Sequence, residues 1–567
     1  MRLIIREYLS LLKEDGELDA ILPTLLLAMN IVPLSSAQKG VRQDGVDVSA
    51  VGKDEHGVKT LFLFLVKQGD LSRNDWDSGP QAVRQSLNDI KDVYLNNRVN
   101  IKHQKLPKKI IVCTGGSLKQ NVESGWNGYI QNHQIDGELE YEFWGGDKLS
   151  SLIEEYLFNE KVIPEALQNR FRKSLVLLSD PSYDLSDYYF VLDDLLLNVD
   201  FGDLSKQSAK KKMLKALRTI NICQNIVYSW AKSEDNLKPA IYCAERTVLH
   251  TWDFIRRHDL YGNQKVSMAF WDNYNTLLNV YTDYFLKIQD HCYVENGFAG
   301  YGHHYLQECL NVFEHLGLIS NTGLLYLFLG ASQQNEGNLQ DAKNICHALK
   351  HYITNHPATS APCYDGHIIE ISQAILLLSS FGEDEFVKNW IIDIINNITY
   401  SYGVMGKYFP IDTDSFDELL EVCIEGSIKK EEAFKMSTLL PILAQWCLAL
   451  NLTEPYQGIV DAIGNIFPNC TLQIWYPDEE TEDVLYKGYA GQTGAVEAPM
   501  SLDRDVATMI DRIIKLQDQI LKPEKISAFA HGQGWMPLMA SRHFRSPLIP
   551  IYWQKHILDK EAKSQAA

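Results

Sequence analysis

The sequence has no uninterrupted apolar run of the roughly 20 residues that a transmembrane helix needs. The longest apolar stretch near the N-terminus, ILPTLLLAMNIVPL, is broken by prolines and is more typical of a core helix. The opening residues, MRLIIREYLSLLKEDGELD, carry acids early and no small-residue cleavage site follows, so no signal peptide is expected. These absences predict a protein without a membrane partner.

Cysteine motifs are missing as well. The ten cysteines are scattered, with no CxxC pair and no Cys/His cluster at zinc-ligand spacing. Free thiols, most of them in the core, are typical of a reducing compartment. The sequence therefore predicts a cytoplasmic protein.

Positive charge is scarce. The chain has 53 Lys and Arg against 73 Asp and Glu, a net charge of −20, which disfavours indiscriminate binding to nucleic acid or anionic membranes. The deficit is uneven, because residues 1–170 have 20 basic against 24 acidic side chains and the remainder has 33 against 49. The first part is therefore the better candidate for binding a polyanion.

The densest basic run is NRVNIKHQKLPKK, residues 97–109. Its candidate nucleic-acid-binding side chains are Lys102, Lys105 and Lys108. The alternative interpretation is a solvated loop that precedes a strand.

Common nucleotide and hydrolase motifs are also absent. There is no GxxxxGK[ST] phosphate loop and no GxSxG element. The glycine-rich CTGGS at 113–117 lacks the phosphate-loop spacing and predicts a turn at the end of a strand.

At 567 residues the chain is too long for one hydrophobic core, and we expect about three or four domains. Over residues 1–170 the pattern predicts helix–helix–strand–strand–helix–strand–helix–strand–helix, an α/β domain with a mixed sheet. The first two strands are joined by a short turn and must pair antiparallel, whereas the later ones return through helices and can be parallel.

Residues 171–465 read as one helix after another, joined by short polar or glycine-containing turns. We expect an irregular array of helical hairpins. The pair at 323–352 resembles a tetratricopeptide hairpin, with the small residues Gly330 and Ala342 placed where two helices would approach, but no clean second copy follows at a 34-residue period. Residues 466–567 have mixed character and are expected to pack on the helical region.

The most informative segment is GVDVSAVGKDEHGVKTLFLFLVKQGD, residues 45–70, which predicts an apolar β-hairpin. Asp47 and Lys67 fall near the same end of it. Unpaired buried charges on such strands cost on the order of several kcal/mol, so a shared role is the better explanation for both. Carboxylates at this position can hold a hard divalent cation, and a neighbouring lysine can orient water and stabilise charge on a phosphate.

Four segments, DGVDVSAVG…LFLFLVKQGD, QAVRQSLNDI, IIVCTGG and YEFWGGDKLSSLI, follow one another in order. Together they resemble the PD-(D/E)xK, restriction-endonuclease-like (Mrr-like) nuclease domains of bacterial antiphage defence proteins. The resemblance covers roughly residues 10–160, about the first quarter of the chain. It implies a restriction-endonuclease-like fold, with Mg²⁺ or Mn²⁺ as cofactor and hydrolysis of DNA as the reaction.

The resemblance also implies roles for individual residues. Asp47 would be the principal metal ligand, and Lys67 would stabilise charge and position the attacking water. The candidate second carboxylates are Asp19, Asp44 and Asp70. On the next helix Gln81 and Gln85 would point toward the substrate backbone, although a polar outer face explains these two glutamines equally well.

One position departs from the family pattern. Two residues before Lys67, where the family has Glu, Asp or Gln, this chain has Leu65, which cannot ligate a metal. Three hypotheses stay open: an active nuclease that uses another acid, a degenerate nuclease fold that binds nucleic acid or recruits a partner enzyme, and an unrelated α/β domain. For the active nuclease, the acidic helical region would sense a trigger, bind a protein partner or mediate homo-oligomer formation, and it would repel DNA until then.

Overall fold

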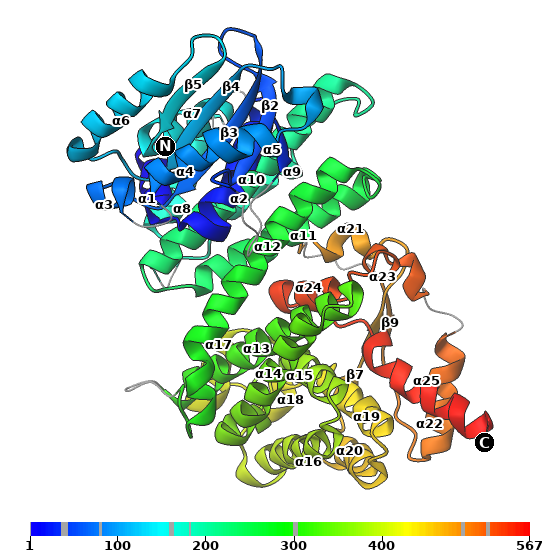
Figure 1. Ribbon diagram of the computed structural model, residues 1–567. Coiled ribbons are helices and arrows are strands. Elements are labelled where there is room, and N and C mark those ends of the chain that lie inside the picture. The colour runs from blue at the N-terminus through cyan, green and yellow to red at the C-terminus, as the bar shows by residue number, and fades with distance from the viewer. Residues whose placement is uncertain are drawn as a thin grey trace. The chain divides into compact units, whose positions relative to one another are not determined.

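The computed structural model describes residues 2–35, 44–78, 82–157, 164–180, 183–298, 304–488, 494–517 and 522–566 (Figure 1). The chain forms two compact units, the first comprising residues 1–254 and 259–276 and the second residues 255–258 and 277–567. These two units do not coincide with the predicted domain boundaries at residues 170 and 465, since the first unit also contains helices beyond residue 170. The three predicted domains therefore stay a prediction.

The first unit contains a five-stranded mixed sheet with the strand order β1-β2-β3-β4-β5. Strands β1 to β3 pair antiparallel, and β3, β4 and β5 pair parallel. The strand bounds are β1 Val32–Ser35, β2 Val48–Lys53, β3 Lys59–Lys67, β4 Lys108–Thr114 and β5 Leu139–Trp144. The predicted mixed sheet is confirmed, together with the antiparallel hairpin and the parallel strands that follow it.

Alternation along β3 separates two apolar faces. Leu61, Leu63 and Leu65 lie in a core formed with α3, α4 and α6, whereas Phe64 packs edge-on against Trp144 on the opposite face. That second face is covered by α2 and α7, and α1 packs along α7. These helices have the bounds α1 Arg2–Leu11, α2 Asp19–Ala28, α3 Arg73–Asp77, α4 Val83–Asp89, α5 Leu95–Asn97, α6 Gln120–His133 and α7 Gly146–Tyr156.

The first unit continues through a helical part. It comprises α8 Glu165–Val176, α9 Ser186–Leu196, α10 Gln207–Ser233, most of α11 Lys238–Arg257 and the first half of α12 Gln264–Ile288. Helix α10 packs on α1 and α2, and the buried Thr219 hydroxyl donates to the Leu157 carbonyl at 2.9 Å. The α/β layer is therefore not independent of the helices that follow it.

The second unit is the array of helices expected from the sequence, with two small two-stranded sheets (Figure 1). Its helices are α13 Tyr305–Gln333, α14 Glu336–Asn355, α15 Ile368–Ser380, α16 Asp384–Tyr400, α17 Phe416–Leu420, α18 Lys430–Ala433, α19 Leu439–Ala449, α20 Thr453–Asn465, α21 Glu482–Leu485, α22 Val506–Gln517, α23 Ser527–Ala530, α24 Met536–Phe544 and α25 Ile551–Ala566. The short strands are β6 Met436–Ser437, β7 Thr471–Leu472, β8 Ile474–Tyr476 and β9 Ala495–Glu497.

The predicted hairpin at 323–352 is present as α13 and α14. A Cβ atom at Gly330 would lie 2.8 Å from Leu339 of α14, and Ala342 is fully buried. Small side chains at these two positions thus allow the helices their close approach.

One local expectation from the sequence was wrong. VPLS forms the edge strand β1 instead of extending a core helix, and an edge strand is where a proline such as Pro33 is tolerated.

The length and composition of α13 bear on the question of a membrane span. Among the described residues α13 alone is long and apolar enough to cross a membrane by length and composition, and 83% of its most apolar window is buried inside the protein. One such helix is weak evidence for a membrane span.

Candidate functional site at the carboxyl end of strand β3

Asp47 lies at the end of β3 because β2 runs antiparallel to it. Val48 pairs with Phe64, so Asp47, one residue earlier, lies beside Leu65, near the carboxyl end of β3. Its backbone N–H donates to the Phe64 carbonyl at 2.9 Å, and its Oδ2 accepts from the Val66 N–H at 2.7 Å. One hydrogen bond thus holds the backbone of Asp47 and the other holds its carboxylate, both against the carboxyl end of β3.

Lys67 is the last residue of β3, and its side chain is only 12% exposed. Its Nζ donates to Oε1 of Glu14 at 3.0 Å. Glu14 begins the π-helical turn η1 (Glu14–Leu18), which connects α1 to α2. The partner of the buried-looking lysine is therefore an acid from the N-terminal helices.

Sequence reasoning missed Glu14. The signal was present as the acidic run EDGELD at 14–19, which interrupts two apolar helices. Sequence alone cannot select one acid from that run, because the packing of α1 on α7 decides which carboxylate reaches the sheet.

Burial and the neighbouring charged groups both change the pKa of Asp47. Burial is the main cause and raises the pKa of Asp47 to about 6. The Val66 N–H and the Lys67 ammonium lower the pKa, whereas Glu14 and Asp19 raise it further. Three carboxyl groups and one ammonium thus act on one another at this edge, and Asp19, the first residue of α2, is the predicted second carboxylate that belongs to the group.

The donor atoms suit a hard cation, since they are all carboxylate oxygens. In the residues the structure describes, however, no three acidic, thiol or imidazole groups are arranged as a complete metal site. Mg²⁺ does not require such a cage, because it is commonly bound by one or two carboxylates together with water and substrate phosphate. The residues present therefore fit Mg²⁺ or Mn²⁺ only with ligands from substrate and water.

Leu65 does not belong to this group. Its side chain is 2% exposed and lies in the apolar core with α3, α4 and α6, whereas Glu14 and Asp19 come from the segment joining α1 and α2. An acid at position 65 would have to be buried in that core. The structure thus explains why position 65 is apolar.

The other two predicted carboxylates have different partners. Asp44 is buried and forms an ion pair with Arg98 at 3.1 Å. Asp70 accepts hydrogen bonds from the N–H and hydroxyl of Ser117, both at 2.9 Å, which lower the pKa of Asp70. Asp70 thereby joins the loop after β3 to the loop after β4, a structural task.

The predicted basic residues lie at the other end of the sheet. Lys67 pairs with Thr114 at the end of β4, whereas Lys108 is the first residue of β4, roughly 20 Å away along the strand. Lys102 and Lys105 are exposed in the segment that precedes Lys108. The structure does not bring these lysines to Asp47.

The structure gives no support to the predicted role of the two glutamines in binding the substrate backbone. The Gln85 side chain donates to Asp89 at 3.0 Å on the outer surface of α4. Gln81 lies outside the described residues.

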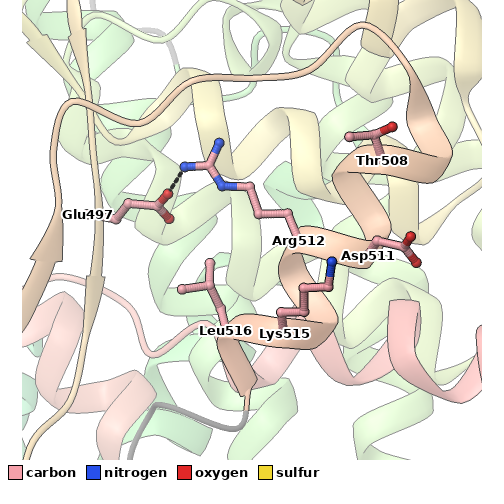
Figure 2. A pocket seen from close by; sticks show the side chains of 6 residues that line it. All are labelled: Glu497, Thr508, Asp511, Arg512, Lys515 and Leu516. Atoms are coloured by element: carbon pink, nitrogen blue, oxygen red, sulfur yellow. Dashed lines mark hydrogen bonds and ion pairs between the residues drawn. The ribbon is translucent and has the colours of Figure 1, made fainter.

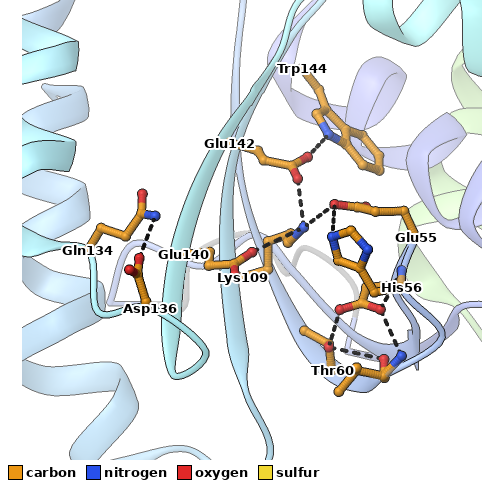
Figure 3. Close-up of polar contacts among 11 residues, drawn as sticks. Glu55, His56, Thr60, Lys109, Gln134, Asp136, Glu140, Glu142 and Trp144 are labelled. Atoms are coloured by element: carbon orange, nitrogen blue, oxygen red, sulfur yellow. Dashed lines mark hydrogen bonds and ion pairs between the residues drawn. The ribbon is translucent and has the colours of Figure 1, made fainter.

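A second lysine with carboxylate partners lies at that far end (Figure 3). Lys109 Nζ contacts Glu142 at 2.7 Å, Glu55 at 3.0 Å and Glu140 at 3.3 Å, and the lysine side chain is 3% exposed. Burial alone would lower the pKa of Lys109, but the hydrogen bonds to Glu142 and Glu55 outweigh it and raise the pKa. Because its donors are occupied by carboxylates, Lys109 has a structural role: its ion pairs join β4 to Glu140 and Glu142 of β5 and to Glu55 of the turn between β2 and β3.

The second unit has a cavity of about 460 Å³, lined by Glu497 of β9 and by one side of α22 (Figure 2). Arg512 is paired there with Glu497, and its guanidinium also donates to the Ser501 carbonyl at 2.8 Å. Acidic and basic side chains alternate around it, and its lining holds no Ser–His or Cys–His pair. We therefore place the candidate site in the first unit.

No protein-family model matches the chain, and neither a curated protein nor a solved structure shows significant similarity to it.

Proposed function

We propose that the chain is a metal-dependent DNA endonuclease whose active site is the Asp47–Lys67 group. The observation that carries this proposal is the meeting of Asp47, Lys67, Glu14 and Asp19 at one end of β3. Their backbone setting, an antiparallel hairpin that leads into parallel strands with helices on both faces, supports a restriction-endonuclease-like fold as part of the same proposal.

Each residue has a stated task in this proposal. Asp47 Oδ2 is held by the Val66 N–H, so Oδ1 is left to bind a cation, with Glu14 or Asp19 as the second carboxylate. The Lys67 ammonium has three donors and uses one on Glu14, so two can reach a phosphate oxygen or the attacking water. A bound Mg²⁺ or Mn²⁺ would supply Lewis-acid stabilisation of the phosphate and activation of water.

A second candidate function also has an observation in its favour. Leu65 is committed to the core, and Lys67 already has Glu14 as its partner, as expected of a nuclease fold that has lost cleavage. Such a protein would bind nucleic acid or recruit a partner enzyme through the helical unit. For either candidate we propose a setting in bacterial antiphage defence, with the acidic helical region gating access and mediating a protein partner or homo-oligomer.

The deciding experiment measures plasmid cleavage in Mg²⁺ or Mn²⁺ by the full chain and by three site variants, Asp47→Ala, Lys67→Ala and Glu14→Gln. We expect each site variant to lower the cleavage rate by at least about 100-fold. The matched control is Glu123→Gln, which changes an exposed acid on α6 and should leave the rate unchanged.

Equal cleavage by the wild type and Asp47→Ala would reject the assigned site. Calorimetric titration with Mg²⁺ separates the two candidates when nothing is cleaved. Binding that is lost in Asp47→Ala would keep the metal site, whereas no binding to the wild type would favour the degenerate fold.

A further inference from the structure

Two histidines lie one turn apart on α14 in the second unit, four residues from each other. His347 is exposed and His351 is partly exposed, so solutes can reach both rings. Side chains at i and i+4 lie on the same side of a helix, and this spacing is the one by which two histidines on a helix bind zinc in metalloproteases.

The two rings are already at a chelating separation. Their centroids are 4.6 Å apart and their planes are inclined by 62°, so they are not stacked. With metal–nitrogen bonds of roughly 2.0–2.1 Å, two imidazoles at about a right angle around one ion have centroids roughly 4.5–5 Å apart. The centroid separation in the free protein thus falls within the range that two imidazoles bound to one ion require.

Tyr293 orients the pair from a neighbouring element. It ends the short 3-10 helix η4 (Gln289–Tyr293), and its hydroxyl lies 3.3 Å from Nδ1 of His347. Its ring centroid is 4.9 Å from that of His351. A partner on Nδ1 leaves Nε2 as the coordinating nitrogen, the arrangement found around metal-bound histidines.

One basic side chain, Lys350, is next to His351 in the sequence. The Lys350 ammonium is itself bound to Glu383 at 2.6 Å, which reduces its repulsion of a cation.

We propose that His347 and His351 form a surface site for a borderline transition-metal ion, Cu²⁺, Ni²⁺ or Zn²⁺, with water completing the coordination shell. Imidazole nitrogens select these ions over Mg²⁺, which prefers oxygen. In the described part of the chain the pair has no third acidic, thiol or imidazole ligand, so it is a two-nitrogen chelate. The site is independent of the proposed nuclease function.

The test uses the untagged full-length protein titrated with Cu²⁺, followed by calorimetry and by electron paramagnetic resonance. We expect the tightest ion to show hyperfine coupling to two imidazole nitrogens. His347→Ala and His351→Ala should each weaken the affinity by at least about tenfold, because either change removes the chelate. The control His56→Ala removes an exposed imidazole in the first unit and should leave the affinity unchanged.

Two further variants make the outcome specific. Tyr293→Phe removes only the hydroxyl and should weaken binding by up to about tenfold, with both nitrogens still coupled. Asp47→Asn should leave Cu²⁺ binding intact, and Mg²⁺ should not displace Cu²⁺. Single-nitrogen coupling in the wild type, or unchanged affinity in His347→Ala and His351→Ala with normal circular dichroism, would overturn the proposal.

Discussion

The ionised carboxylate of Asp47 is unfavourable for the stability of the protein. A free aspartate loses its proton near pH 3.9, whereas Asp47 retains its proton up to about pH 6 because it is buried beside Glu14 and Asp19. The folded state therefore binds more protons than the unfolded state between these pH values, and stability falls as the pH rises through that window. A residue kept despite such a cost is typical of a functional site.

Asp47→Asn tests this reasoning at the residue scale. We expect the variant to raise the free energy of unfolding by about 1–2 kcal/mol at pH 8, because no buried charge then forms, and to match the wild type near pH 4. Guanidinium unfolding at the two pH values measures the difference. Asp75→Asn is a control of opposite sign: Asp75 accepts hydrogen bonds from Ser72 at the start of α3 and has a lowered pKa, so the variant should destabilise at pH 8, by at most about 0.5 kcal/mol because the side chain is exposed. Destabilisation by Asp47→Asn at both pH values would contradict the prediction.

At the scale of elements, the glycines after β4 bring three backbone segments together. A Cβ atom at Gly115 would lie 1.8 Å from the Leu9 carbonyl oxygen of α1, and one at Gly116 would lie 2.4 Å from the backbone of Gly69. The Gly146 N–H donates to the Gly116 carbonyl at 2.7 Å, which connects α7 to the same turn. The predicted turn in CTGGS is therefore also the contact that positions α1, and with it Glu14.

Gly115→Ala should displace α1 and destabilise the first unit by about 1–3 kcal/mol, the usual cost of overpacking. Because Glu14 follows α1, the same variant should weaken divalent-cation binding at Asp47. The matched control is Gly128→Ala in α6, where a Cβ atom meets no other atom within 4 Å and alanine should stabilise the helix by about 0.5–1 kcal/mol. Thermal melting and Mg²⁺ calorimetry measure both effects, and equal behaviour of the two variants would refute this role for Gly115.

The sequence predicted the elements better than the site. Strands β2 to β5 and helices α4, α6 and α7 follow from strong apolar periodicity, and the pairing directions follow from connection length. Glu14 was not predictable, since which acid of the run 14–19 reaches Lys67 depends on how α1 packs. The positions of Asp44 and Asp70 depended equally on tertiary partners, Arg98 and Ser117.

At the scale of the whole molecule, the α/β layer and the helices up to residue 276 form one compact unit. Helix α10 packs on α1 and α2, and the acids of the candidate site come from the turn η1 between these helices, Glu14, and from the first residue of α2, Asp19. A truncation close to the end of the α/β layer would expose that apolar contact to water. The gating hypothesis therefore has to be examined with a longer fragment.

We expect the fragment 1–288, which keeps α12 whole, to be soluble and to unfold cooperatively. The fragment 1–180 should melt at least about 5 °C lower, or aggregate, because it lacks the cover of α10. Differential scanning calorimetry of both fragments measures this difference. If gating by the helical region is correct, the fragment 1–288 should also cleave plasmid without a trigger; a folded but inert fragment would count against gating.

The burial of α13 has a consequence for biosynthesis. This helix packs against α14, α15 and α24, and a Cβ atom at Gly317 would already lie 3.0 Å from Arg542 of α24. About 200 residues separate the end of α13 from the start of α24, so at 5–20 residues per second the ribosome needs roughly 10–40 s to complete the cover. During that interval the nascent chain leaves the side of α13 that α24 later covers exposed to water, and slowing translation of the last third of the message should lower the soluble yield more than slowing the first third.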